Sequence, residues 1–189
     1  MTRRPKCIIV TGRPGSGKAT LCKHLRPRLW LPLVSRDEIK EGYVNSFGVK
    51  HDELSDGANL IATNIFFDIV DRHLTSNVSV IIEAAFQHRV WEPRIAKIAE
   101  IADPLMIICD VDAETAADRH LQRGLDEPER EFYHGDKRVV VFRETGVVLA
   151  ASDYDTPHFA IPTINVSTVG EYSPSIDEIV DMIRTEQLR

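Results

Sequence analysis

The sequence predicts a three-layer α/β domain with a mostly parallel sheet of about five strands, helices on both faces and a small lid. Its length of 189 residues, with 43% hydrophobic residues, suits one hydrophobic core. Short apolar segments alternate with longer amphipathic ones, which is typical of βαβ units. Neither a repeat nor a linker-like segment divides the chain, so we expect a single domain over residues 1–189.

Five apolar segments are the candidate strands. Each is nearly continuous in apolar character, as expected for parallel strands that helices cover on both faces. They are residues 7–10 (CIIV), 31–34, 78–83, 105–111 and a weaker segment at 159–166.

Amphipathic segments between these strands predict helices with a period of 3.6 residues. Pro174 and Ser175 open the last of them, in which one face is apolar. Right-handed crossovers through such helices make the sheet parallel. The polar segment at 123–138 contains Gly and Pro, and we expect a surface loop or lid there. The predicted helices are residues 21–29, about 54–74, 89–102, 113–123 and 175–188.

Composition excludes several function classes. The net charge of −6 and pI near 5.6 disfavour a nucleic-acid-binding surface, so an anionic ligand would need a local basic pocket. The N-terminal apolar run is too short for a signal peptide, and no stretch approaches the roughly 20 apolar residues of a membrane helix. We therefore expect a cytoplasmic protein with no membrane partner. Its three cysteines, Cys7, Cys22 and Cys109, lack metal-ligand spacing and are expected to be buried hydrophobes.

Residues 12–20, GRPGSGKAT, follow the first predicted strand and match a phosphate-binding loop. Its glycines let backbone amides approach phosphate oxygens, and the helix that follows adds a partial positive charge. Lys18 then brings a full charge to the β and γ phosphates. The residues expected to bind the nucleotide are Gly12, Arg13, Pro14, Gly15, Ser16, Gly17, Lys18, Ala19 and Thr20.

Ala19 stands where many phosphate-binding loops place a magnesium-binding hydroxyl. The loop resembles instead that of small kinases similar to adenylate kinase, GxPGxGKGT, in which the hydroxyl comes one residue later, here at Thr20. The resemblance implies that Thr20 contacts phosphate while nucleotide oxygens and water hold most of the metal. Magnesium commonly keeps several waters, so one missing protein ligand need not abolish its binding.

Asp37 follows the second predicted strand, at the edge of the sheet where ligands bind. A carboxylate there could accept a proton from an attacking hydroxyl. Arg36 and Lys40 could attract an anionic substrate or orient Asp37. The alternative is that Asp37, or Ser35, only caps the helix, which contributes about 1 kcal/mol.

Glu83 ends the third predicted strand, in the position of a Walker B acid. A charge there is rarely left unpaired, so Glu83 should meet a metal-bound water, the substrate or a structural arginine. Arg119 and Arg123 lie four residues apart on one helical face, either as functional cations or as a solvated basic face. Arg138 and Arg143 are weaker candidates, and a lone loop histidine such as His134 is more often ordinary surface.

Together these motifs resemble the family of AAA-type ATP-binding P-loop kinases, which is similar to zeta-toxin kinases, chloramphenicol phosphotransferase and gluconate kinase. The resemblance implies a P-loop NTPase fold, ATP and Mg²⁺ as cofactors, and transfer of the γ-phosphoryl group to a hydroxyl of a small molecule. Lys40 replaces the family's usual arginine. The implied roles are catalysis by Lys18, Asp37, Arg119 and Arg123, substrate binding by Arg36, Asp37, Lys40 and Glu83, and metal binding by Thr20 and Glu83.

Two other functions fit the same motifs. One is a nucleotide-binding regulatory ATPase or switch that acts through a protein partner, although the NKxD motif of a GTPase switch is missing from the sequence. The other is a toxin kinase similar to the zeta toxins. It differs from a metabolic kinase in substrate and biology rather than in fold.

Overall fold

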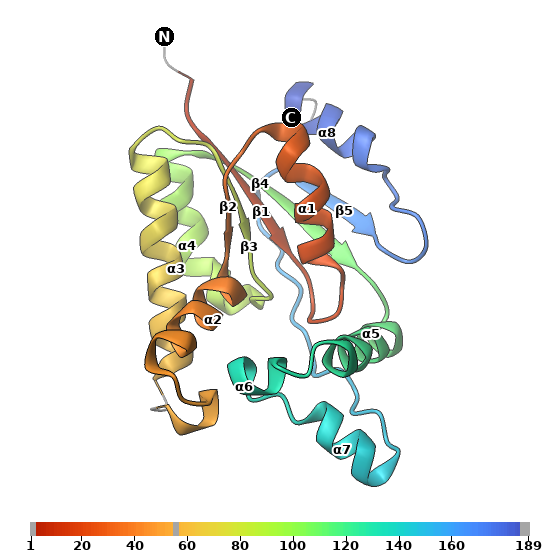
Figure 1. The fold of residues 1–189 in the computed structure, drawn as a ribbon. Helices are drawn as coiled ribbons and strands as arrows, with labels where there is room; N and C mark the ends of the chain where they lie inside the picture. Colours follow the sequence, from red (N-terminus) through yellow and green to blue (C-terminus); the bar gives the residue numbers. More distant parts are fainter. Residues whose placement is uncertain (1–2, 55–56, 186–189) are drawn as a thin grey trace.

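Five strands form the centre of the computed structural model, which describes residues 3–54 and 57–185 (Figure 1). They lie in the order β2–β3–β1–β4–β5, and every pairing between neighbours is parallel. This confirms the predicted α/β class and makes the sheet wholly parallel within the described residues. The strands are β1 (Lys6–Thr11), β2 (Leu33–Ser35), β3 (Val80–Glu83), β4 (Asp103–Asp110) and β5 (Thr163–Ser167).

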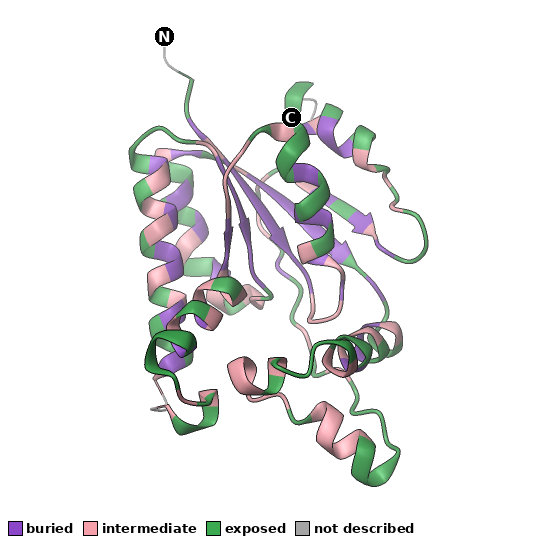
Figure 2. Ribbon diagram, viewed as in Figure 1, coloured by how far each residue is buried: buried purple, intermediate pink, exposed green. Residues whose placement is uncertain are grey.

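Helices cover both faces of this sheet and create two apolar layers (Figures 1 and 2). Successive residues of a strand point to opposite faces, so β1 contributes Cys7 and Ile9 to one layer and Ile8 and Val10 to the other. Helices α3 (Ala58–Thr75) and α4 (His88–Ile101) pack on the first layer. Helices α1 (Lys18–Leu29) and α8 (Ile176–Thr185) pack on the second. Because all five strands are parallel, their carboxyl ends lie at the same edge of the sheet.

Prolines explain two differences between predicted and observed strands. β5 begins at Thr163 rather than 159, because Pro162 has no amide hydrogen to donate to the ladder. Its carbonyl still accepts from the amide of Met106, at 2.9 Å. Similarly, β2 begins after Pro32. Both apolar segments therefore keep their place but become shorter strands.

The boundaries of two helices also differ from the prediction. A short 3₁₀ helix, η1 (His51–Glu53), precedes α3, which begins at Ala58. Residues 55–56 of the predicted helix at 54–74, and residues 186–188 of the last predicted helix, lie outside the described residues.

The segment at 123–138 is more regular than expected. Helix α5 (Ala113–Asp126) extends into it, and α6 (Arg130–His134) and the start of α7 (Arg138–Thr145) occupy its remainder. An ion pair between Arg123 and Glu127, at 3.2 Å, supports the last turn of α5. Gly135 then ends α6 at a φ of 65°, in the left-handed region that favours glycine. The segment expected to be a loop or lid is thus partly helical, with irregular turns at 127–129 and 135–137, and it lies beside the carboxyl ends of the strands (Figure 1).

All three cysteines are free and buried, as the sequence predicts. None of the helices in residues 3–54 and 57–185 is both long enough and apolar enough to span a membrane.

Candidate active site

The loop between β1 and α1 is rich in glycine. Gly12, Gly15 and Gly17 have φ values of 142°, 85° and 83°, which side-chain-bearing residues rarely adopt. A Cβ at Gly12 would lie 2.5 Å from the carbonyl oxygen of Cys109. A Cβ at Gly15 would collide with the carbonyl of Ala116 on α5. Glycine is therefore required at both places by contact with β4 and α5 as well as by φ.

Polar side chains of this loop are buried near the start of α1. Lys18 is buried, and its Nζ donates to the carbonyl of Arg13 at 3.0 Å. Ser16 Oγ is buried and has no hydrogen-bond partner among the described residues. Thr20 is exposed in the first turn of α1, whereas Ala19 is partly buried. The loop thus combines an ammonium, an orphan hydroxyl and a helix N-terminus, which suit a phosphate group.

Glu83 and Ser35 lie side by side at the ends of β3 and β2. Ser35 Oγ donates to Glu83 Oε2 at 2.9 Å, and Glu83 is only 6% exposed. Burial above all raises the pKa of Glu83, and Lys18 counteracts part of this rise. Ser35 occupies the cap position of α2 (Arg36–Phe47), but its hydroxyl is committed to Glu83 and not to the helix. Glu83 is therefore bonded to a serine rather than to the structural arginine considered above.

Asp37 lies inside the first turn of α2, so it does not occupy the N-cap position. Its side chain is 48% exposed and lies 3.6 Å from Arg36 Nη1. Partial burial acts to raise the pKa of Asp37, but interactions with neighbouring side chains, His134 and Arg36 foremost, lower it below its usual value. The carboxylate is consequently ionised and accessible at neutral pH, as a proton acceptor must be.

Arg36 and Lys40 lie on the same helix but have different partners. Arg36 Nη2 donates to the side chain of Asn59 at 2.9 Å and to its carbonyl at 3.2 Å. Lys40 is only 5% exposed, and its Nζ donates weakly to the carbonyl of His134 at 3.5 Å. Burial first, and then the charge of Arg36, lower the pKa of Lys40 to about 8. Arg36 also pairs with Asp37, whereas none of the ion pairs among the described residues includes Lys40.

We expect Lys40→Met to stabilise the protein at pH 7, because burying the ammonium is unfavourable. The unfolded chain, with a Lys pKa of 10.5, binds more protons than the folded chain between about pH 8 and 10.5. Wild-type stability should therefore gain up to about 3 kcal/mol as the pH rises through that window, and the advantage of the variant should shrink equally. Urea unfolding at several pH values measures this difference. Lys50→Met, at an exposed position, is the control, and an equal pH trend in both variants would contradict the assignment.

Arg119 is joined to the phosphate-binding loop through Thr168. Arg119 Nη1 donates to Thr168 Oγ1 at 3.1 Å and Nη2 to the Thr168 carbonyl at 2.8 Å. The same hydroxyl donates to the carbonyl of Ser16 at 3.0 Å. Sequence reasoning missed Thr168, whose one signal is its place just after the last strand.

Replacing Thr168 by valine is expected to weaken binding of a non-hydrolysable ATP analogue about tenfold. The variant keeps the shape of the side chain but leaves the Ser16 carbonyl without its donor and frees one side of Arg119. Isothermal titration calorimetry measures the effect, and Thr168→Ser should restore most of the affinity. Wild-type affinity in the valine variant would refute this role.

Arg123 differs from Arg119 although both were expected on one face. Its side chain is half exposed and pairs with Glu127 at 3.2 Å. Its charge nevertheless acts to lower the pKa of Glu83. The two arginines are thus not equivalent: one is fixed against the loop and the other lies in solvent near the acid.

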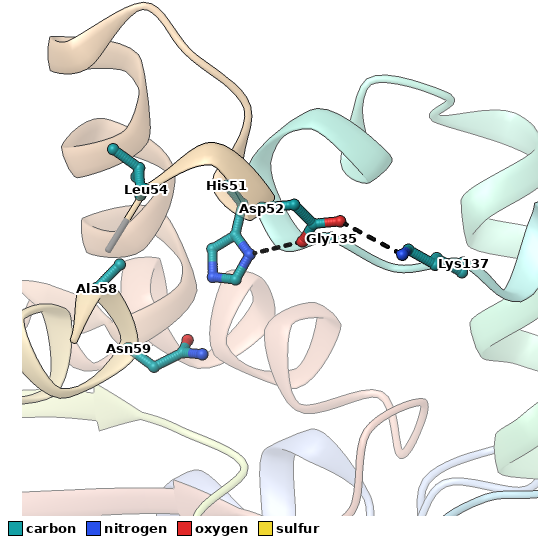
Figure 3. Close-up of a pocket in the computed structure, with 7 residues that line it drawn as sticks. All are labelled: His51, Asp52, Leu54, Ala58, Asn59, Gly135 and Lys137. Carbon is teal, nitrogen blue, oxygen red and sulfur yellow. Dashed lines mark hydrogen bonds and ion pairs between the residues drawn. The ribbon is translucent and has the colours of Figure 1, made fainter. Parts of the chain in front are cut away.

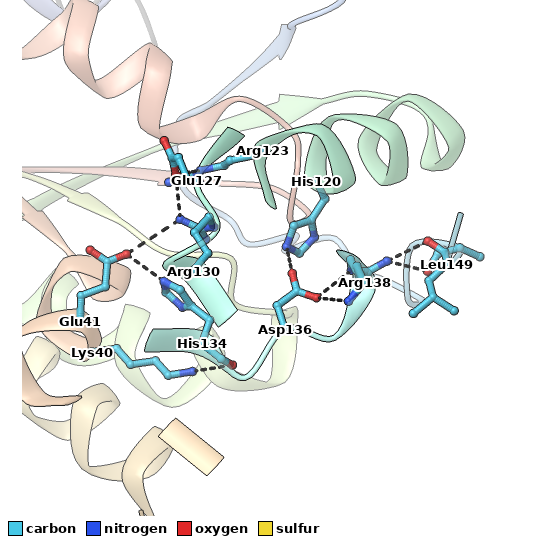
Figure 4. Close-up of polar contacts among 11 residues, drawn as sticks. Lys40, Glu41, His120, Arg123, Glu127, Arg130, His134, Asp136, Arg138 and Leu149 are labelled. Atoms are coloured by element: carbon cyan, nitrogen blue, oxygen red, sulfur yellow. Dashed lines mark hydrogen bonds and ion pairs between the residues drawn. The ribbon is translucent and has the colours of Figure 1, made fainter. Parts of the chain in front are cut away.

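Ion pairs attach α6 to α2 (Figure 4). Glu41 Oε1 lies 2.8 Å from His134 Nε2 and 3.9 Å from Arg130 Nη1. The His134 side chain is only 11% exposed, so the expectation of an ordinary surface residue is wrong. The segment that we expected to be a lid therefore lies against the helix that holds Asp37.

A second group of contacts ties α7 to α5 (Figure 4). Asp136 Oδ2 lies 2.8 Å from His120 Nε2, and Arg138 donates to the carbonyl of Leu149 at 2.8 Å. Partial burial opposes ionisation of Asp136, yet the hydrogen bond from His120 and the amide of Arg138 bring its pKa to about 2. Arg138 thus has structural partners, and Arg143 is exposed on α7.

A glycine-rich loop between a strand and a helix, strand-end acids and cations on the following helices define a P-loop domain of the kinase class. The family model described as "AAA domain" matches residues 7–159, and the chain belongs to this family. The resemblance to P-loop kinases inferred from the sequence is thereby confirmed.

Similar proteins agree with this class. Adenylate kinase isoenzyme 5 of Bos taurus is 24% identical over an alignment of 168 positions, which covers 76% of this chain; the chain spans 29% of that protein's length. A "putative kinase" from Chloroflexus aurantiacus J-10-fl has a similar structure, with a TM-score of 0.76, 24% identity and coverage of 97% and 98% of the two chains. The APS kinase CysC of Mycobacterium tuberculosis, in complex with AMPPNP and APS, has a TM-score of 0.62 at 14% identity, with 97% of each chain covered. At these identities the structural likeness shows the fold alone.

Proposed function

We propose that this protein transfers the γ-phosphoryl group of ATP to a hydroxyl group of a small molecule. One observation supports this proposal above the others. Asp37 is ionised and accessible, and it lies in the electrostatic field of Lys18, the lysine of the phosphate-binding loop. A proton acceptor beside the γ-phosphate position is what a hydroxyl kinase requires and what simple nucleotide binding does not.

In this proposal the loop holds the triphosphate. Backbone amides of residues 12–17 other than Pro14 and the ammonium of Lys18 bind the phosphate oxygens, while Arg119 and Arg123 stabilise charge on the transferring group. The acceptor oxygen forms a bond to the γ-phosphorus as the bond to the β-phosphate oxygen breaks. Asp37 takes the proton that the acceptor hydroxyl loses, and ADP leaves.

Oxygen-rich side chains of the site fit magnesium in kind. Glu83 has one carboxylate oxygen not bonded to Ser35, and Thr20 presents an exposed hydroxyl from α1. Within residues 3–54 and 57–185, no group of three or more His, Cys, Asp or Glu side chains could hold a metal ion. Phosphate oxygens and water would therefore supply most of the ligands. When bound, Mg²⁺ would neutralise charge on the β and γ phosphates.

Arg36 and Lys40 would contact the acceptor on the side of α2. Both are largely buried cations close to Asp37, and Glu83 lies across from them at the end of β3. Substitution of Glu83 distinguishes its two possible roles. Weaker binding of the acceptor would assign Glu83 to the acceptor, and weaker binding of magnesium would assign it to the metal.

Phosphoryl transfer to a panel of hydroxyl compounds tests the proposal. The purified chain is incubated with ATP, MgCl₂ and each compound, and ³¹P NMR distinguishes a new phosphate ester from inorganic phosphate. We expect an ester with at least one small molecule. The panel includes an oligonucleotide with a free 5′-hydroxyl, and an ester on that compound alone would overturn the small-molecule acceptor. ATP turnover that yields only inorganic phosphate would overturn the kinase proposal.

A further inference from the structure

A cavity of about 480 Å³ lies between the core and the α6–α7 segment (Figure 3). Its volume falls within the range of small-molecule sites in proteins. One wall comes from η1, Leu54 and the start of α3, and the other from the turn that joins α6 to α7. The lining residues are His51, Asp52, Leu54, Ala58, Asn59, Gly135 and Lys137.

The turn between α6 and α7 fits closely against this wall. Gly135 has a φ of 65°, and a Cβ there would collide with Asp52 Oδ1 and lie 2.9 Å from His51 Nδ1. Lys137 Nζ lies 3.7 Å from Asp52 Oδ2 (Figure 3). A glycine and an ion pair therefore hold the turn over the cavity, so that a molecule inside contacts both core and turn.

Arg36 connects the cavity to the proposed base. Its Nη2 donates to Asn59, which lines the cavity, and its Nη1 lies 3.6 Å from Asp37 Oδ1. One guanidinium thus separates the lining from Asp37. An acceptor whose reacting hydroxyl meets Asp37 could place the rest of its body in this cavity.

In the part of the chain that the structure describes, buried polar atoms without hydrogen-bond partners lie at three places between the phosphate-binding loop and the cavity. Three buried side-chain polar atoms lack a hydrogen-bond partner among the described residues: Ser16 Oγ, Arg36 Nε and His51 Nε2. Buried polar groups are normally hydrogen-bonded, so each such exception suggests a missing partner. These atoms belong to the phosphate-binding loop, to the connecting arginine and to the cavity wall.

Charges on the cavity lining cancel. Asp52 contributes one negative charge and Lys137 one positive charge, and they pair with each other. His51 Nδ1 also lies 3.3 Å from Asp52 Oδ1. Asn59 adds an amide, and the imidazole of His51 is the only ring-bearing side chain among the described residues that line the cavity. A carboxylate, an ammonium and an amide suit hydroxyl groups, each of which donates and accepts, and offer no aromatic faces for a base.

We infer that this cavity binds the body of the phosphoryl acceptor, and that the acceptor is a neutral, hydroxyl-rich molecule of the sugar or polyol class. The inference rests on the proposed function. An acceptor bearing its own carboxylate or phosphate would find no unpaired cation in the lining, because Lys137 pairs with Asp52 and neither Arg36 nor Lys40 lines the cavity. A nucleoside would place a flat base where no aromatic side chain stacks on it.

A matched set of acceptors tests the class. A neutral hexose and a hexitol are compared with the corresponding sugar acid, the sugar monophosphate and a nucleoside, each with ATP and MgCl₂. We expect the highest kcat/KM for a neutral compound. In parallel, calorimetry measures binding of the hexose and the hexitol to the chain with AMPPNP present.

Two variants then test the location. Asp52→Asn and Lys137→Met should each raise KM for the best neutral acceptor about tenfold, because each removes a charged hydrogen-bonding group. Glu53→Gln and Lys50→Met, exposed neighbours outside the lining, are the matched controls.

Either of two results would overturn the inference: a charged acceptor or a nucleoside preferred over the neutral compounds, or KM changes no larger than those of the controls. If no compound is phosphorylated but a neutral compound still binds with sensitivity to Asp52→Asn, the cavity assignment stands and the proposed function alone fails. Absence of both transfer and binding rejects both.

Discussion

Lys18→Ala is expected to weaken ATP binding by about 100-fold and to reduce turnover below detection. The ammonium is buried at the start of α1 and held within the loop by the carbonyl of Arg13. A charge-assisted bond to phosphate contributes about 2–3 kcal/mol, which corresponds to this loss in affinity. Removing it also deprives the transferring group of one of its stabilising positive charges.

Calorimetric titration with AMPPNP measures the binding effect, and a coupled ADP assay measures turnover. Lys23→Ala is the matched control, since Lys23 is exposed on the same helix. Circular dichroism shows whether the variant is folded. A folded Lys18→Ala protein that binds AMPPNP with wild-type affinity would exclude the loop as the nucleotide site.

Asp37→Asn is expected to lower kcat by about 10²–10⁴-fold with little change in AMPPNP affinity, because an amide cannot accept the acceptor's proton. The substitution preserves shape and the position beside Arg36. It is assayed with the best acceptor from the hydroxyl panel. The pKa of Asp37 lies below its usual value. As the pH is lowered, wild-type kcat should therefore begin to fall only at a pH below the pKa of an ordinary aspartate.

Glu38→Gln provides the control for Asp37, because Glu38 is the adjacent carboxylate and is exposed. If Asp37→Asn retains full transfer, another group takes the proton and the proposed base is wrong. If both variants lose activity equally, the effect is one of overall charge and not of proton transfer.

The sequence predicted those parts of the fold that depend on local patterns. Each strand is a short, nearly continuous apolar segment, the helices between them are amphipathic, and the loop is one continuous motif. The N-cap interpretation of Asp37 could not be decided from the same pattern, because capping and catalysis both place a carboxylate after a strand. The commitment of Ser35 to Glu83, and the position of Asp37 two residues after the Ser35 N-cap, exclude the N-cap interpretation; the role of Asp37 as base is our proposal.

Contacts between distant segments had no such signature. Glu41 and His134 are 93 positions apart, and Arg119 and Thr168 are 49 apart. No periodicity in the sequence relates the members of either pair. The first pair meets only when α6 packs on α2, and the second only when β5 joins β4. The cavity likewise depends on the α6–α7 turn, which the sequence presented as irregular polar chain.

The position of Thr168 indicates how much of the chain is needed for function. The family model ends at residue 159, before β5 begins, while the hydroxyl that joins Arg119 to the phosphate-binding loop belongs to Thr168, nine positions later and just beyond β5. A fragment cut at the end of the region that the family model matches would retain every recognisable motif. It would nonetheless lose the outer strand, the last helix and the bond that orients Arg119. Motif content and the minimal functional length are therefore different quantities in this protein.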